Sequence, residues 1–245
     1  MASQYTVYLS SWYKMENQKD LLIDIRNLTR WYKESTALLF DKFNFSLYKN
    51  EFCVIMWKSW VGKSTLVKLI IWSILPPAKT IYHKNEDISK YSDQELQKYR
   101  RKIWVVFQDC KLLESASVKE NIQYPLKIYG LWDVVIGNKM KNVISKLWLE
   151  KVINKPVKFL STWEKHKVAI ARALIHEPEF LITDEPTGNL DREHTEQIWD
   201  LLIETNRIGN TVLLVTHDIH LVNYLKAKYK IRIYLMKYTA PLWKV

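Results

Sequence analysis

Glycine, cysteine and long apolar runs are all scarce in this sequence. Its 245 residues include 5 glycines, whereas average usage predicts roughly 17. The two cysteines, Cys53 and Cys110, are far apart and indicate neither a disulfide framework nor a zinc site, so a reducing compartment fits best. No apolar run approaches the roughly 18 residues of a membrane span, and no secretion signal is visible. We therefore expect a cytoplasmic protein that does not itself cross a membrane.

Tryptophan and basic residues are the types in excess. The 11 tryptophans and 5 glycines together make 16, close to the expected number of glycines. Lysine and arginine number 37 against 26 acidic residues, which gives a net charge of +11. This charge permits nucleotides, nucleic acid or an anionic membrane face as partners, but its scatter is typical of a solvated surface. With 48% hydrophobic residues, the composition is that of a folded globular protein.

Short strand-like runs alternate with helical periodicity from about residue 21 onward. Strands are expected at 21–28, 43–47, 52–56, 80–83, 103–107, 180–183 and 211–215, and helices at 64–74, 92–101, 163–175, 191–206 and 219–226. The amphipathic pattern between 117 and 155 predicts a helical subdomain, placed at about 109–160. This alternation predicts an α/β fold with a mainly parallel sheet, an antiparallel β edge and a helical subdomain.

The N-terminal residues 1–20 show no clear periodicity. We expect them to be an extension without regular structure, with Met15 as an alternative start, and we expect the folded domain to occupy residues 21–245.

A phosphate-loop pattern, G-x-x-x-x-G-K-[ST], falls on residues 57–64, with Trp57 in place of the first glycine. In such a loop backbone N–H groups converge on phosphates at a helix N-terminus. Lys63 would reach the β- and γ-phosphates, and the Ser64 hydroxyl would bind Mg²⁺. The alternative is an ordinary strand-to-helix turn that happens to contain a lysine. The position of Gly62 and Lys63 between an apolar strand and an apolar helix favours the phosphate site.

Two carboxylates, Asp184 and Glu185, follow the apolar run at 180–183, at the strand end where open α/β sheets bind ligands. This is the Walker B pattern, in which Asp184 would hold Mg²⁺ and Glu185 would polarise the attacking water. Paired acids after a strand could instead form a solvated turn or a helix cap. The phosphate loop upstream favours the catalytic interpretation, because the two segments supply complementary halves of one Mg–nucleotide site.

Further motifs appear in a fixed order around these two. Residues 160–164 read Leu-Ser-Thr-Trp-Glu, Gln108 follows an apolar run, Asp191 closes a Pro-Thr-Gly-Asn-Leu-Asp run, and His217 follows the last apolar strand. With these motifs the chain resembles the ATP-binding cassette (ABC) ATPases over about residues 21–237. The resemblance implies a P-loop NTPase core and identifies 160–164 as the signature motif, Gln108 as the Q-loop, residues 189–191 as the D-loop and His217 as the H-loop.

The resemblance also implies roles for individual residues. The catalytic residues would be Glu185, His217 and Gln108, and the metal ligands would be Ser64, Gln108 and Asp184. The ATP-binding residues would be Tyr32, Trp57, Lys58, Ser59, Trp60, Val61, Gly62, Lys63, Ser64, Thr65, Ser161, Thr162, Trp163, Glu164 and Asp191. Tyr32 matches the aromatic residue that stacks on adenine, and the Ser161 segment would cover the γ-phosphate bound by a second copy.

Several tryptophans stand where the resembled family has glycine. They are Trp57, Trp60, Trp104, Trp148 and Trp163, and Trp31 and Trp72 are further candidates. Glycine lets a backbone adopt positive φ and approach a ligand, whereas an indole at 57 or 60 would occupy phosphate space. Our hypothesis is that the gene uses UGA as a glycine codon that has been translated as tryptophan. The alternatives are a nucleotide-blocked scaffold that has lost its glycines, and tryptophans that are simply packed core residues, which suits Trp199 or Trp243 but not a phosphate loop.

Within the family, the segments 105–113, 186–191 and 206–212 look most like the cell-division ATPases. Lipoprotein-release and macrolide-export ATPases share the 186–191 run and stay an alternative. The resemblance implies a homodimer that closes head-to-tail on ATP and reopens on hydrolysis, coupled to an integral membrane permease at the inner face of the cell membrane. A nucleic-acid-associated ABC ATPase is a further alternative, but no long basic run supports it, so no nucleic acid is expected.

The contact with the membrane subunit is expected beside the Q-loop, at 110–113 and at 124–131 of the helical subdomain. Apolar residues there are mixed with few acids. In the alternative interpretation these residues simply form the core of the subdomain.

Overall fold

The computed structural model describes residues 5–9, 20–31, 38–57, 62–188, 190–229 and 231–236. Its strands are β1 (Tyr5–Leu9), β2 (Leu21–Trp31), β3 (Leu38–Tyr48), β4 (Phe52–Trp57), β5 (Ile81–His83), β6 (Glu86–Asp87), β7 (Ile103–Val106), β8 (Phe180–Asp184), β9 (Thr211–Thr216) and β10 (Arg232–Met236). Its α-helices are α1 (Lys63–Ile70), α2 (Asp93–Arg101), α3 (Val118–Ile128), α4 (Asp133–Leu147), α5 (Thr162–Leu174), α6 (Arg192–Arg207) and α7 (Ile219–Lys228). Short 3-10 helices span Ile88–Lys90, Glu150–Val152 and Val157–Phe159.

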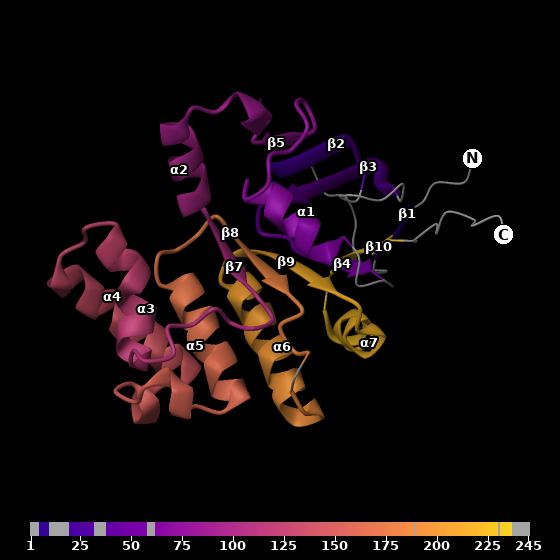
Figure 1. The fold of residues 1–245 in the computed structure, drawn as a ribbon. Helices are drawn as coiled ribbons and strands as arrows, with labels where there is room; N and C mark the ends of the chain where they lie inside the picture. Colours follow the sequence, from indigo (N-terminus) through magenta and orange to yellow (C-terminus); the bar gives the residue numbers. More distant parts are fainter. Residues whose placement is uncertain are drawn as a thin grey trace.

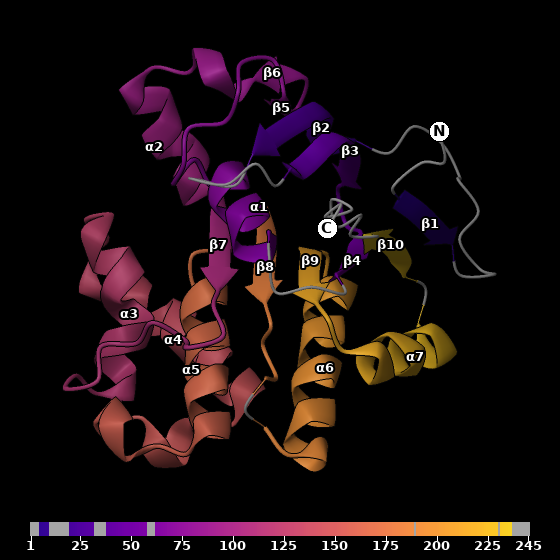
Figure 2. The ribbon, with the colours of Figure 1, turned by 45° about the vertical axis from the view of Figure 1, so that its right-hand side comes forward.

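The central sheet has the strand order β1-β10-β4-β9-β8-β7 (Figures 1 and 2). All neighbouring pairs in it are parallel except β1 and β10, which pair antiparallel at one edge. A second, antiparallel sheet has the order β3-β2-β5-β6. The structure therefore confirms the α/β fold with a mainly parallel sheet and an antiparallel β component.

The central sheet is buried on both faces, as β4 illustrates. Cys53 and Ile55 pack into the core that β4 shares with α1 and the antiparallel sheet. Val54 and Met56 pack into a second core with α5, α6 and α7. An apolar strand without polar alternation is typical of a parallel sheet covered by other layers on both sides. This arrangement fixes the C-terminal ends of β4, β8 and β9, where the predicted site residues lie.

Helices α3 and α4 form a lobe beside α5 (Figure 1). Val118 and Ile122 of α3 and Ile136 and Met140 of α4 share an apolar core with Val168 of α5. This core is separate from the two that flank the central sheet, so α5 links the lobe to the rest of the domain. Among the described residues, no helix is both long and apolar enough to cross a bilayer.

Several element boundaries differ from those predicted. Helix α1 ends at Ile70 rather than at residue 74, because Trp72 has a φ of 55° and takes the chain out of the helix. Strands β6 and β10 were not predicted. Residues Tyr5–Leu9 form β1 against β10, so this part of the expected N-terminal extension has regular structure.

Candidate active site

Gly62 positions the lysine of the phosphate loop. It caps the N-terminus of α1 with a φ of 103°, a backbone conformation that glycine adopts readily and other residues rarely do. A Cβ atom here would also lie 2.7 Å from Cζ2 of Trp57, which leaves no room for a side chain. Lys63 is consequently the first residue of α1, and its side chain is buried. The positive end of the helix dipole lies at the same point.

Glu185 follows β8, and its carboxylate contacts the side chains of Lys63 and His217. Its φ of 50° is uncommon for a residue with a side chain, and its N–H donates to the Val215 carbonyl at 3.0 Å. Lys63 Nζ donates to Glu185 Oε1 in a buried ion pair. His217 Nδ1 lies 2.6 Å from the same oxygen and 3.4 Å from Lys63 Nζ. The structure thus brings the predicted phosphate lysine, catalytic carboxylate and H-loop histidine into one cluster.

Ser64 and Asp184 form the second half of the site. Ser64 Oγ donates to Asp184 Oδ2 at 3.0 Å. Burial raises the pKa of the Asp184 carboxyl, the hydrogen bond from Ser64 lowers it, and the charge of Glu185 raises it again. One hydroxyl and one carboxylate match the way proteins hold Mg²⁺, with phosphate oxygens and water completing the shell. The donor set therefore fits the predicted magnesium ion.

Gln108 lies beside Gly188, the residue just before the D-loop. A Cβ atom on Gly188 would lie 2.8 Å from Gln108 Nε2, so the glutamine amide packs directly on that glycine. Gln108 follows β7, and Gly188 lies three residues after Glu185. The absence of a side chain at Gly188 therefore allows the Q-loop and the D-loop segment to touch.

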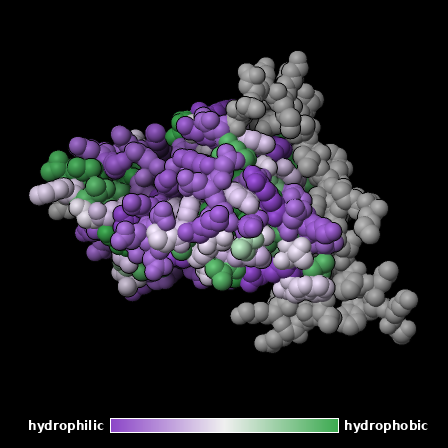
Figure 3. Space-filling model, turned by 90° about the horizontal axis from the view of Figure 1, so that it is seen from above, coloured by the Kyte–Doolittle hydropathy of each residue, from purple (hydrophilic) through white to green (hydrophobic). Residues whose placement is uncertain are grey.

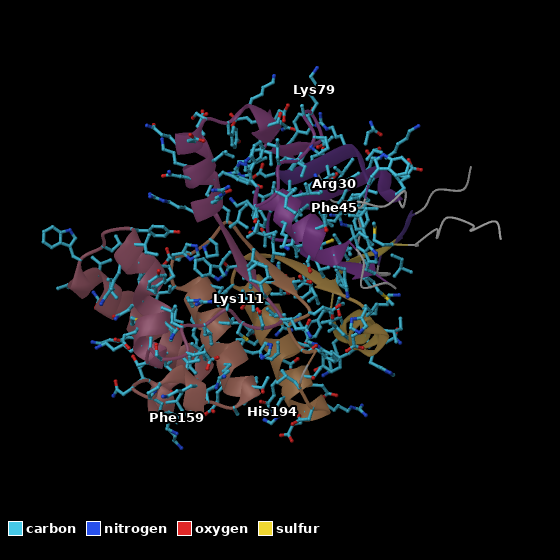
Figure 4. The ribbon with its side chains drawn as sticks, in the orientation of Figure 1. Arg30, Phe45, Lys79, Lys111, Phe159 and His194 are labelled. Carbon is cyan, nitrogen blue, oxygen red and sulfur yellow. The ribbon has the colours of Figure 1, made fainter. Side chains whose placement is uncertain are left out.

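The signature segment begins α5. Ser161 is the N-cap, and it forms a capping box with Glu164: the Glu164 N–H donates to Ser161 Oγ, and the Ser161 N–H donates to Glu164 Oε2. Glu164 thus stabilises the helix start. Ser161 and Thr162 are exposed, and Figure 4 shows Phe159, just before them, at the end of the molecule remote from α1. Within one chain the signature segment therefore lies away from Lys63.

Asp191 caps α6 at the same end of the molecule. Its carboxylate accepts from the His194 N–H at 2.9 Å and lies 2.6 Å from His194 Nδ1. These contacts lower the pKa of Asp191. The ring centroids of His194 and Trp163 are 5.3 Å apart, so the starts of α5 and α6 are neighbours (Figure 4). Signature segment and D-loop residue thus share one exposed face.

Some predicted residues lie outside the described part of the chain. They are Tyr32, Lys58, Ser59, Trp60 and Val61, together with Asn189 of the D-loop run. Thr65 is described and half-buried in the first turn of α1. Motif reasoning missed Thr216, which hydrogen-bonds Glu185; its only sequence signal is its place between an apolar strand and His217.

The tryptophans at predicted glycine positions have different surroundings. The Trp57 indole is buried, and its centroid lies 5.6 Å from that of Phe40, edge to face. This corrects the expectation that it stands in phosphate space: the ring lies in the core and crowds Gly62. Trp148 ends α4 with φ 51° and ψ 50°, the left-handed helix-ending conformation that usually carries glycine. Trp72 has positive φ as well.

Comparison with known proteins identifies the family. The ABC transporter family model matches residues 40–188. The chain belongs to the ABC transporter family. It is 34% identical to the cell division ATP-binding protein FtsE of Mycobacterium tuberculosis, over 85% of this chain and 90% of that one. It is 39% identical to FtsE of Escherichia coli, over 73% of this chain and 81% of that one. The chain is thus an FtsE-like ABC ATP-binding protein.

Solved ABC cassettes share its fold. The structure of cbiO1 from Clostridium perfringens, part of an ABC transporter complex, aligns with a TM-score of 0.76 and 30% identity, over 84% of this chain and 82% of that one. The dimeric cassette MJ0796, bound to ADP and Pi, aligns with a TM-score of 0.73 and 31% identity, over 83% of this chain and 91% of that one. This ABC protein is an ATPase, as its phosphate-loop and Walker B residues predict.

Proposed function

We propose that this ABC ATPase acts in cell division, as the ATP-hydrolysing subunit of a membrane complex with an FtsX-like permease. The observation that carries the ATPase role is the convergence of Lys63, Ser64, Asp184, Glu185 and His217 at the C-terminal ends of β4, β8 and β9. The similarity to the two FtsE proteins supports the cell-division role over lipoprotein or macrolide export. It also favours an ATPase over a nucleotide-blocked scaffold.

ATP would bind across the start of α1. Lys63 would exchange its ion pair with Glu185 for the β- and γ-phosphates, while Ser64 and Asp184 would hold Mg²⁺, which supplies charge neutralisation on the phosphates. Gln108 would complete the metal shell after leaving Gly188. Glu185, released from Lys63, would accept a proton from the attacking water, and His217 would contact the γ-phosphate. Tyr32 would stack on adenine.

A second copy would complete the site. Ser161, Thr162, Trp163 and Glu164 begin α5 on an exposed face that does not reach Lys63 of the same chain. A head-to-tail homodimer would place this helix N-terminus, with its N–H groups, over the γ-phosphate of the partner. The dimeric ADP- and Pi-bound cassette at 31% identity supports this arrangement. Hydrolysis of ATP to ADP and phosphate would reopen the dimer, so the reaction would drive a conformational cycle.

The active form would carry glycine at positions 57, 60 and 163. The crowding of Gly62 by the Trp57 ring, and the left-handed backbones of Trp72 and Trp148, support glycine at the family positions. A bulky side chain with positive φ is an outlier that glycine removes. UGA codons at these positions would explain why tryptophan replaces glycine at several of them.

The permease would contact exposed apolar residues near the Q-loop. Leu113, Tyr124 and Ile128 are 44%, 47% and 60% exposed. Figure 3 shows that the far end of the lobe also carries apolar residues, on a face that is otherwise largely hydrophilic. Cys110 and Leu126, by contrast, are buried in the core and cannot take part. For Cys110 and Leu126, therefore, the alternative interpretation applies, in which these residues belong to the protein core. The complex would sit on the inner face of the cell membrane.

We expect charged substitutions on this surface to abolish capture of the permease. Leu113→Glu, Tyr124→Glu and Ile128→Glu should each reduce co-purification with the membrane subunit at least about tenfold, because a buried unpaired charge costs several kcal/mol at an interface. ATP binding should stay unchanged, since none of the three touches the nucleotide residues. Ile208→Glu, at another exposed apolar residue, is the matched control. Undiminished co-purification across all three variants would place the permease elsewhere, and recovery of nucleic acid instead would contradict the membrane role.

A further inference from the structure

Thr216 makes two hydrogen bonds that join three parts of the site. It is the last residue of β9 and only 1% exposed. Its Oγ1 donates to Glu185 Oε2 at 3.2 Å and accepts from the Asp218 N–H at 3.1 Å. A hydroxyl has one hydrogen to donate and lone pairs to accept, so both bonds form together. We propose that Thr216 is a positioning residue for ATP hydrolysis, which holds Glu185 and the His217 turn in one arrangement.

The bond to Oε2 matters because the other oxygen of Glu185 has to change partners. Lys63 and His217 both contact Oε1. On the proposed function, on which this inference rests, ATP draws Lys63 away from Oε1. The hydroxyl of Thr216 stays on Oε2, so the carboxylate keeps its plane while Oε1 becomes available to the attacking water. A carboxylate held at one oxygen is aimed in advance, and such pre-organisation lowers the barrier to the proton transfer.

The bond from Asp218 matters because it shapes the turn that carries His217. The Thr216 hydroxyl accepts from an N–H two residues ahead, which is the turn that serine and threonine side chains form with their own backbone. Asp218 in turn caps α7, since its Oδ1 accepts from the N–H groups of His220 and Leu221 at 2.8 and 3.2 Å. His217 lies between these two local contacts, so its backbone direction is fixed from both sides.

Valine and serine at position 216 separate the hydroxyl from the shape of the residue. Thr216→Val keeps the β-branched shape but leaves Glu185 Oε2 and the Asp218 N–H without this partner. Thr216→Ser keeps the hydroxyl and loses only a methyl group. Thr205 offers a matched control: it is 2% exposed, and its hydroxyl donates to the Leu201 carbonyl of its own helix α6 at 2.8 Å.

The experiment measures kcat and KM for ATP in the full chain with glycine at 57, 60 and 163. Thr216→Val should lower kcat about 10- to 100-fold, the factor for loss of one hydrogen bond to a charged group, with KM changed less than about threefold. Thr216→Ser should stay within about threefold of the parent in kcat. Thr205→Val should keep the parent kcat, even where its melting temperature falls as far as that of Thr216→Val.

Three results would overturn the inference: a parental kcat in Thr216→Val, a rise in KM alone, or an equal loss of kcat in Thr216→Val and Thr205→Val. Absence of hydrolysis in the parent itself would count against the proposed function rather than against the role of Thr216. In that case crystal structures of the parent and of Thr216→Val test the inference. The inference predicts that the Glu185 carboxylate is rotated in the variant relative to the parent. An unmoved carboxylate there would overturn it.

Discussion

Replacement of the catalytic carboxylate should give a protein that binds ATP but scarcely hydrolyses it. We expect Glu185→Gln, in the chain with glycine at 57, 60 and 163, to lose about 100- to 1000-fold in kcat, because an amide cannot accept the proton of the attacking water. ATP affinity should be kept, since Lys63 and Ser64 remain. The variant should also stay dimeric in ATP, because the step that reopens the dimer is blocked. Steady-state kinetics and size-exclusion chromatography with ATP measure both effects.

Glu179 provides the control for this substitution. It precedes β8, is half-buried and pairs with Lys84 and His83 on the antiparallel sheet, away from the site. Glu179→Gln should hydrolyse ATP at the parent rate. If Glu185→Gln hydrolysed ATP at that rate as well, Glu185 would not be the catalytic carboxylate and the Walker B assignment would be misplaced.

Glycine and tryptophan at the phosphate loop should differ greatly in ATP binding. The chain with glycine at 57, 60 and 163 should bind ATP at least about 100-fold more tightly than the chain with tryptophan. The Trp57 ring already crowds Gly62 at the helix end, and a loop that carries a second indole cannot bring its N–H groups onto the phosphates. Isothermal titration calorimetry with ATP and Mg²⁺ measures the difference.

Trp132→Gly is the control for this comparison, because Trp132 is 82% exposed and precedes α4 on the lobe. It should leave ATP affinity unchanged. Equal affinity of the glycine and tryptophan forms would show that the indoles do not obstruct the loop.

Much of the site followed from the sequence, because its residues stand at fixed positions in strand-loop-helix units. Lys63 begins the helix that follows an apolar strand and the phosphate loop, and Asp184 ends another apolar strand. Parallel strands bring their C-terminal ends to one edge, so the convergence of the two segments could be predicted without coordinates. The helix predicted at 92–101 is confirmed as α2, and the capping box of Ser92 and Glu95 at its start joins residues only three positions apart.

The parts that were missed depend on contacts between residues distant in sequence. Strand β10 was not predicted because Arg232 interrupts its apolar pattern, yet this arginine is buried and its Nη2 donates to Glu51 Oε2 at 2.7 Å. Thr216 was missed because its partner, Glu185, follows a different strand, β8, and is distant in sequence. The orientation of the Trp57 ring toward Phe40, rather than into phosphate space, depends on the packing of the antiparallel sheet.

The central claim is that this chain works as an ATPase whose phosphate loop and signature segment contain glycine. Peptide mass spectrometry of the protein isolated from its natural source tests that claim most directly. We expect peptides that cover positions 57, 60 and 163 to carry glycine at each of them. Tryptophan at 57 and 60 in the natural protein would contradict the claim, since the loop would then be obstructed in the cell as well.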